Sequence, residues 1–172
     1  MTDLRDDEFE RLYAAEAQGL FAFLAYRTGD RGLAEDLLAD AFERALRGRG
    51  RFDRRRGSAK TWLYAIALNV LRDHARRAAA EGRALDRVGS DPEVQSEGRE
   101  GSDPLVALVQ RDELSRALAA LAPEEREAIA LRFGADLTVP EMAVVLGEPL
   151  TTVEGRVYRA LRKLREALGA RR

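Results

Sequence analysis

A basic helix near the end of the chain carries the side chains with the clearest chemical use. Residues 150–168 repeat apolar side chains every three or four positions, which predicts a helix with one buried face. The side chains off that stripe are acidic, small, aromatic or cationic: Glu154, Gly155, Tyr158, Arg159 and Arg162. Residues at the start of such a helix reach base edges in a DNA major groove, and arginines along it neutralise phosphates. The pattern favours DNA binding over a helix whose arginines are merely solvated.

The elements before this helix have the order of a helix-turn-helix. Thr138 and Glu141 have capping-box spacing, Gly147 is a helix stop, and Thr151 with Glu154 repeats the capping-box spacing. We therefore expect Glu154 mainly to cap the final helix, with an acceptor for a cytosine amino group as a second role. The final helix is expected to bury Val153, Val157, Leu161, Leu164 and Leu168.

A second basic surface lies in the first half of the chain. Residues 44–77 hold eleven Lys or Arg and two acids, a local charge of +9, and residues 156–172 hold seven and one, a local charge of +6. Cations and aromatic rings alternate in the first cluster: Arg51, Phe52, Arg54, Arg55, Arg56, Lys60, Trp62, Tyr64, Arg72, Arg76 and Arg77. Unpaired bases stack on aromatic faces while arginine follows the phosphates, so the mixture indicates single-stranded nucleic acid. Trp62 and Tyr64 are equally consistent with a core position.

Several function classes lack the residues they need. The chain has no cysteine and one histidine, His74, so we expect no disulfide, no metal site and no cofactor. Glu35 and Asp36 are adjacent and diverge on a helix, which favours a protein-docking face over paired catalytic carboxylates. No apolar run approaches the ~20 residues of a membrane span, and the acidic N-terminus lacks a secretory signal. We expect a cytoplasmic protein that is not an enzyme.

Helical periodicity dominates, and the expected fold is all-α with two small helical domains. Helices are expected over 9–25, 33–46 and from 62 to 77, with breaks at 28–32 and 47–60. Residues 80–104 hold seven acids, four glycines and three serines, which is typical of a flexible acidic linker. The expected domains are therefore 1–79 and 105–172, joined by 80–104.

With these motifs placed, the chain resembles an extracytoplasmic-function sigma factor of the sigma-70 family of bacterial RNA polymerase initiation factors. Glu35-Asp-Leu-Leu-Ala-Asp-Ala-Phe42 resembles the region 2.2 helix, which docks on the polymerase clamp helices. The segment 52–77, including Trp62-Leu-Tyr-Ala-Ile-Ala-Leu-Asn69, resembles regions 2.3 and 2.4, which open the −10 element and capture its bases. Segments 121–132, 141–147 and Thr152-Val-Glu-Gly-Arg-Val-Tyr-Arg-Ala160 resemble region 4, which reads the −35 element.

The resemblance implies core RNA polymerase, promoter DNA and an anti-sigma factor as partners, with no membrane insertion. It implies −35 contacts from Arg132, Thr152, Glu154, Gly155, Arg156, Tyr158, Arg159 and Arg162. It implies −10 contacts from Phe52, Arg56, Ser58, Lys60, Trp62, Asn69, Arg72, Asp73, Arg76 and Arg77. It implies polymerase contacts from Glu35, Asp36, Leu37, Asp40 and Phe42.

Geometry adds a requirement to this function. About seventeen base pairs at ~3.4 Å each separate the two promoter elements by roughly 58 Å. A flexible linker of 25 residues has an r.m.s. span of roughly 25–30 Å and a limit near ~85 Å, so polymerase must hold the modules apart. The family often has Lys or Arg and then Ser where this chain has Glu154-Gly155, which affects promoter preference. The alternative is a stand-alone helix-turn-helix regulator that binds duplex DNA as a dimer.

Overall fold

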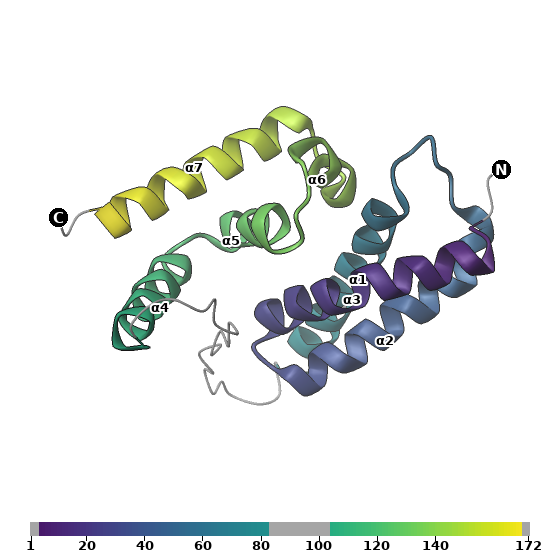
Figure 1. Ribbon diagram of the computed structural model, residues 1–172, viewed down its shortest axis with the longest axis horizontal. Coiled ribbons are helices and arrows are strands. Elements are labelled where there is room, and N and C mark those ends of the chain that lie inside the picture. Colours follow the sequence, from purple (N-terminus) through teal and green to yellow (C-terminus); the bar gives the residue numbers. More distant parts are fainter. Residues whose placement is uncertain (1–3, 83–103, 170–172) are drawn as a thin grey trace.

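The computed structural model describes residues 4–82 and 104–169, and every regular element in these two ranges is helical (Figure 1). The predicted all-α fold with two helical units is confirmed. The first unit contains α1 (Asp6–Thr28), α2 (Arg31–Gly48), the short 3-10 turn η1 (Arg49–Arg51) and α3 (Ala59–Gly82). The second contains α4 (Pro104–Ala119), α5 (Pro123–Ile129), the π-helical turn η2 (Ala130–Gly134), α6 (Val139–Leu146) and α7 (Leu150–Gly169).

Local side-chain chemistry sets the breaks between α1, α2 and α3. Gly29 ends α1 in the left-handed region at φ 68°, and Asp30 then caps α2 by accepting a 3.1 Å hydrogen bond from the Leu33 amide. Before α3, the Ser58 hydroxyl accepts a 3.1 Å bond from the Thr61 amide. The interruption expected at 28–32 is confirmed, and the glycine-containing segment after α2 forms only η1 and a loop.

The helix-turn-helix in the second unit is capped as predicted at its first helix. The Thr138 amide donates a 2.7 Å hydrogen bond to Glu141, whose own amide donates to the Thr138 hydroxyl at 3.4 Å. Gly147 ends α6 in the left-handed region at φ 67°. The tight turn that follows lets Val153 of α7 pack in the same buried cluster as Met142 of α6.

Two expectations for the last helix are wrong. The helix α7 starts at Leu150, so Thr151 lies inside it and no Thr151–Glu154 capping box forms; the Pro149 carbonyl instead accepts from the Thr152 amide at 3.0 Å. The buried stripe consists of Val153, Val157 and Ala160, with Leu164 partly buried. Leu161 remains 37% exposed, since it lies about 100° around the helix from the buried Ala160, and Leu168, near the C-terminal end of α7, remains 44% exposed.

The two units pack against each other, which the sequence does not predict. Element η2 contacts α1. The helix α6 contacts α3 (Figure 1). The buried apolar cluster is shared, with Leu24 and Leu68 from the first unit and Leu131 and Met142 from the second. The helix α3 continues to Gly82, while residues 83–103, which include most of the expected linker, lie outside the described residues.

Candidate nucleic-acid interfaces

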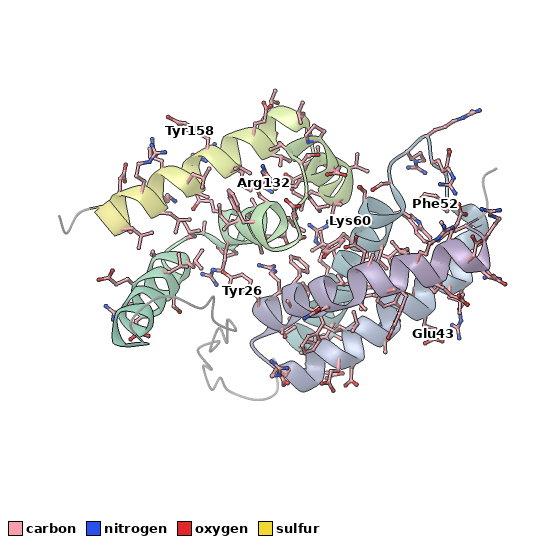
Figure 2. The ribbon with its side chains drawn as sticks, in the orientation of Figure 1. Tyr26, Glu43, Phe52, Lys60, Arg132 and Tyr158 are labelled. Atoms are coloured by element: carbon pink, nitrogen blue, oxygen red, sulfur yellow. The ribbon has the colours of Figure 1, made fainter. Side chains whose placement is uncertain are left out.

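The first half of α7 presents a polar, aromatic and cationic face to solvent. Because Val153, Val157 and Ala160 are buried, the opposite side of the helix is free. Tyr158 is 69% exposed and points away from the other helices (Figure 2). Five of the residues predicted for the −35 element are exposed on this helix: Thr152, Glu154, Tyr158, Arg159 and Arg162.

Gly155 and Arg156 have structural roles beside this face. A Cβ at position 155 would lie 3.2 Å from Nη1 of Arg159, so the glycine leaves room for that guanidinium to fold over the helix. Arg156 pairs with Glu148 in the α6–α7 turn at 2.7 Å, and only 13% of its side chain is exposed. Its charge is therefore already neutralised by Glu148, a partner that the sequence motif does not reveal.

Arg132 lies in the π-helical turn η2. Its Nη1 donates to the Leu137 carbonyl at 3.4 Å and lies 3.9 Å from the Asp136 carboxylate. The guanidinium also covers the Phe133 ring, with 5.4 Å to the ring centroid. Phe133 is 59% exposed, and sequence reasoning missed it; the only available signal was a large aromatic residue directly before Gly134. Arg132 and Phe133 thus form a cation–π pair with an exposed ring beside the helix-turn-helix.

The loop before α3 is built on an internal aromatic pair. Phe52 is only 2% exposed, and its ring packs against Trp62 with 5.3 Å between centroids. Gly48 lies under the same indole, since a Cβ there would be 3.6 Å from it. Phe52 therefore supports the loop in this conformation instead of offering a free face to a base, and Trp62 is partly buried. Tyr64, 1% exposed, is a core residue, and burial raises the pKa of its phenol.

Cations lie before and in the first turn of α3 and again in its second half. Arg56, Asn69, Arg76 and Arg77 are exposed, as the predicted −10 surface requires. Ser58 is exposed but caps the helix. Lys60 is partly covered: its Nζ lies 3.8 Å from Glu16 and 6.0 Å from the Tyr64 ring centroid. The residues predicted for the −10 element are therefore not uniformly free.

An ion-pair network joins α2 to α3. Arg44 donates to Asp40 at 2.8 Å and to Asp73 at 3.2 Å, and Asp73 also accepts from Arg76 at 2.5 Å. The Arg44 guanidinium first, and then that of Arg76, lowers the pKa of the Asp73 carboxyl. Asp40 and Asp73, predicted to contact polymerase and DNA respectively, are both engaged by arginines of their own unit.

The segment predicted to dock on polymerase divides into exposed acids and buried apolar residues. Glu35 and Asp36 are exposed on α2, whereas Leu37 and Phe42 are 5% and 7% exposed. The Phe42 ring contacts that of Tyr13, with 4.7 Å between centroids. Tyr13 is 52% exposed, and no motif in the sequence marks it.

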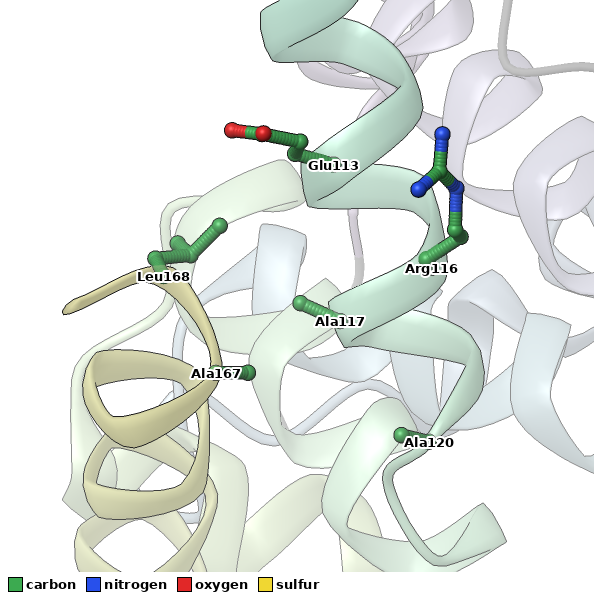
Figure 3. A pocket seen from close by; sticks show the side chains of 6 residues that line it. All are labelled: Glu113, Arg116, Ala117, Ala120, Ala167 and Leu168. Carbon is green, nitrogen blue, oxygen red and sulfur yellow. The ribbon is translucent and has the colours of Figure 1, made fainter. Parts of the chain in front are cut away.

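A shallow pocket lies between α4 and α7, at the end of α7 away from Tyr158. Its lining combines alanines and a leucine with two charged side chains, as Figure 3 shows: Glu113, Arg116, Ala117, Ala120, Ala167 and Leu168. The described residues contain no group of three or more His, Cys, Asp or Glu side chains arranged to hold a metal ion. Among residues 4–82 and 104–169, no helix combines the length and the apolar character needed to cross a bilayer.

Comparison with known proteins identifies both units. Sigma-70 region 2 matches residues 12–81, and Sigma-70 region 4 matches residues 111–164. The ECF RNA polymerase sigma factor SigC of Mycobacterium tuberculosis is 35% identical over 151 residues, which cover 88% of this chain and 78% of SigC. The chain belongs to the extracytoplasmic-function sigma factors of the sigma-70 family, so the resemblance is confirmed.

Two further relatives show the extent of the similarity. The ECF RNA polymerase sigma factor BldN of Streptomyces coelicolor is 31% identical over 162 residues; the match covers 94% of this chain and 61% of BldN, less than two thirds of its length. The sigma factor RpoE of Bartonella quintana, solved in complex with the anti-sigma factor NepR, superposes with a TM-score of 0.78 at 25% identity, over 96% of this chain and 99% of RpoE.

Proposed function

We propose that this chain is an alternative sigma factor that binds core RNA polymerase and directs promoter-specific initiation by recognising −35 and −10 elements. The observation that supports this best is the exposed face of α7 around Tyr158, carried on the same chain as the cationic surface of α3. A single chain with one duplex-reading helix and one surface suited to unpaired bases fits a promoter, which offers both.

The exposed side chains of α7 make the main contacts to the −35 element. Arg159 and Arg162 neutralise phosphates, while Thr152, Glu154 and Tyr158 meet base edges near the helix start. Since Glu154 does not cap α7, its carboxylate is available to accept from a cytosine amino group. Arg132 and Arg156 contact DNA from the edge of this face, once a DNA phosphate replaces the carboxylate with which each arginine is paired, that of Asp136 or Glu148.

For the −10 element, Arg56, Asn69, Arg76 and Arg77 are the exposed contacts, and Lys60 and Arg72 join them. Phe52, Trp62 and Ser58 shape the loop that captures bases, and Asp73 orients Arg76. For polymerase docking, Glu35 and Asp36 form the charged contact and Tyr13 an aromatic one. Leu37, Asp40 and Phe42 hold α2 in place beneath them.

The partners are core polymerase, promoter DNA and an anti-sigma factor. The last is proposed because RpoE, which this chain resembles over nearly its whole length, was solved with the anti-sigma factor NepR. The chain acts in the cytoplasm, where polymerase is found, and contributes specificity without catalysing a reaction or holding a cofactor.

Transcription with purified components tests the proposal. Core polymerase with the full chain is expected to give discrete transcripts from a subset of templates in a promoter library, and neither component alone is expected to do so. Two variants are compared. Asp36→Arg reverses the docking charge, and Glu10→Arg changes an exposed acid on α1 as the control. Absence of promoter-dependent transcripts with the wild-type chain would refute the function.

The alternative, a stand-alone helix-turn-helix regulator, gives different results in two simple experiments. A regulator of that kind is a dimer by gel filtration and binds specific duplex DNA without polymerase. The region 2 match over residues 12–81 favours the sigma factor, for which a monomer that needs polymerase is expected.

A further inference from the structure

The loop before α3, residues 52–58, has a backbone that its own residues order. The Asp53 carboxylate accepts a 3.0 Å hydrogen bond from the Arg55 amide, and the Asp53 carbonyl accepts one of 3.0 Å from the Arg56 amide. These two bonds close a tight turn of the Asx type. Gly57 then takes φ 151°, a conformation that residues with a side chain rarely adopt, and leads into α3. The loop therefore has a defined conformation before any DNA is bound.

The first turn of α1 lies beside this loop and holds it from outside (Figure 1). Nη2 of Arg54 donates a 2.5 Å hydrogen bond to Oε1 of Glu8, whose side chain is only 18% exposed. The Arg54 guanidinium also lies over the Phe52 ring, 5.8 Å from its centroid. The Arg5 amide, followed by the Arg54 guanidinium, lowers the pKa of the Glu8 carboxyl, so this acid is charged at neutral pH. Arg54 is thus fixed between an acid of α1 and the buried ring on which the loop is built.

The same end of α1 is tied to η1, the element that precedes the loop. Leu4 is 2% exposed, and its amide donates a 3.3 Å hydrogen bond to the Arg49 carbonyl. The Arg49 guanidinium in turn pairs with the Asp6 carboxylate. The start of α1 therefore contacts the chain before the loop and again within it, which restricts how the loop can move relative to the helix.

The charged side chains of the loop consequently differ in what they are free to bind. Asp53 closes the turn, and Arg54 is paired with α1. Arg55 and Arg56 are exposed, and no carboxylate among residues 4–82 and 104–169 pairs with either guanidinium. Arginines without a carboxylate partner keep their donors available for phosphate oxygens. Composition counts three equivalent arginines in this segment, whereas the fold makes one of them a support and leaves two free.

We propose that Glu8 is a positioning residue for recognition of the −10 element, because through Arg54 it holds the loop in the conformation that binds DNA. In that conformation Arg55 joins Arg56 as a contact to the DNA backbone. A loop that is already ordered avoids the entropy cost of being ordered on binding, and it presents its side chains to bases in one arrangement. The recognition role rests on the proposed function of the −10 surface, whereas the support of the loop by Glu8 does not.

Hydrogen exchange of the loop amides tests the support in the absence of DNA. Glu8→Gln removes the charge but keeps an oxygen that can accept from the Arg5 amide, so α1 stays capped. Arg54→Ala removes the partner instead. Each variant of the full chain is expected to exchange the loop amides about twofold or more faster than wild type, and the double variant scarcely faster than either. Glu10→Gln, which alters an exposed acid on the same helix, is the matched control.

Circular dichroism confirms that each variant is folded. Wild-type exchange rates in the loop of both folded variants would overturn the support by Glu8.

Transcription by core polymerase with the full chain tests the role in recognition. The templates keep one −35 element and vary every position of the −10 element. Glu8→Gln and Arg54→Ala are each expected to reduce discrimination among −10 sequences by about twofold or more, while the ranking of −35 sequences in a second library is kept. If Arg54 were itself a DNA contact, Glu8→Gln would free its guanidinium and strengthen binding, whereas Arg54→Ala would weaken it. Such opposite effects, or faster loop exchange with unchanged −10 discrimination, would overturn the positioning role.

Arg55→Ala separately tests the added contact. The polymerase complex of this variant is expected to bind −10 oligonucleotides more weakly by a similar factor for all sequences, with a salt slope smaller by about 1. Arg11→Ala, which removes an exposed cation of α1 that pairs with Asp7, is the control. An unchanged salt slope would overturn the Arg55 contact. Failure of the proposed function is seen separately, since the wild-type chain would then give no promoter-dependent transcript while hydrogen exchange still reports the Glu8–Arg54 support.

Discussion

The Asp73 carboxylate on α3 accepts a 3.2 Å hydrogen bond from the guanidinium of Arg44 on α2. The same carboxylate binds Arg76, while Arg44 also binds Asp40. Asp73 thus lies at the centre of a chain of alternating charges and fixes where the Arg76 guanidinium points. This positioning explains an acid among the cations of the proposed −10 surface, because the carboxylate holds those cations in place.

Replacing Asp73 with Asn is therefore expected to weaken −10 binding only through Arg76. In a double-mutant cycle, Asp73→Asn combined with Arg76→Ala should be scarcely worse than Arg76→Ala alone, with a coupling free energy of at least about 0.5 kcal/mol. The measurement is the affinity of the polymerase complex for a −10 oligonucleotide. Glu81→Gln, an exposed acid on the same helix, is the control. Additive effects of the two substitutions would show that Asp73 acts independently of Arg76.

A second carboxylate stabilises the C-terminal unit. Glu125 of α5 is 6% exposed and accepts hydrogen bonds from Lys163 of α7 at 2.9 and 2.8 Å and from the Ala122 amide at 3.1 Å. Replacing Glu125 with Ala is expected to lower the free energy of unfolding by about 2 kcal/mol, as for other hydrogen bonds to charged groups. Glu124→Ala, which alters an exposed neighbour, should change it by less than ~0.5 kcal/mol. Urea unfolding measures both, and equal effects would contradict the role of the Lys163 pair.

The same carboxylate predicts a pH dependence of stability. The Lys163 hydrogen bonds, followed by that of the Ala122 amide, lower the pKa of Glu125 below its ordinary value of 4.5. Its contribution is therefore fully present above about pH 4.5 and is lost as the pH falls through the lower, folded-state pKa. The difference in unfolding free energy between wild type and Glu125→Gln should shrink over that range. A difference that stays constant down to pH 2 would mean that the charge of Glu125 is not involved.

The turn of the helix-turn-helix depends on a glycine. Gly147 has φ 67°, and no atom lies within 4 Å of a Cβ placed there, so an alanine would meet only backbone strain. Gly147→Ala is expected to cost about 1–2 kcal/mol, the penalty of the left-handed region for an L-residue. Gly134→Ala is the matched control, because position 134 has equal space and no positive φ. Thermal unfolding should rank the two variants clearly, and equal melting temperatures would refute the strain argument.

Periodicity and capping predicted the helices, because both are local properties of the sequence. The Thr138–Glu141 capping box was found where the pattern placed it, whereas the equivalent Thr151–Glu154 pattern failed because Pro149 lets α7 begin at Leu150. Residue spacing also identified the exposed face around Tyr158. The domain boundaries at residues 79 and 105, which were also inferred from the sequence, remain predictions.

Contacts between distant segments were beyond such reasoning. The spacing of charges along the chain does not reveal that Arg72 faces Glu127, or that Glu148 neutralises Arg156, since each pair forms only when separate helices or turns meet. Phe52 shows the same limit of sequence reasoning for an aromatic residue. Arg51 and Arg54 lie close to it in the sequence, which indicates a base-stacking loop, but its ring is buried against Trp62 in the folded unit. Composition identifies what a segment can bind, and packing decides which of its side chains are free to do so.

Tyr158 gives the sharpest test of the −35 surface because it is exposed and contributes little to folding. At 69% exposure, its replacement by Ala should change the free energy of unfolding by less than about 0.5 kcal/mol. If its ring meets base edges, the same substitution should reduce transcription from the preferred promoters and alter which −35 sequences are selected from a library. The expected cost is about 1–3 kcal/mol for each base that the side chain reads.

Arg165→Ala, which removes an exposed cation later on α7, is the control for a phosphate contact. That variant should weaken all promoters alike and flatten the salt dependence without changing the ranking of sequences. A Tyr158→Ala chain that kept the wild-type ranking of −35 sequences would show that the exposed face of α7 does not read bases at this position.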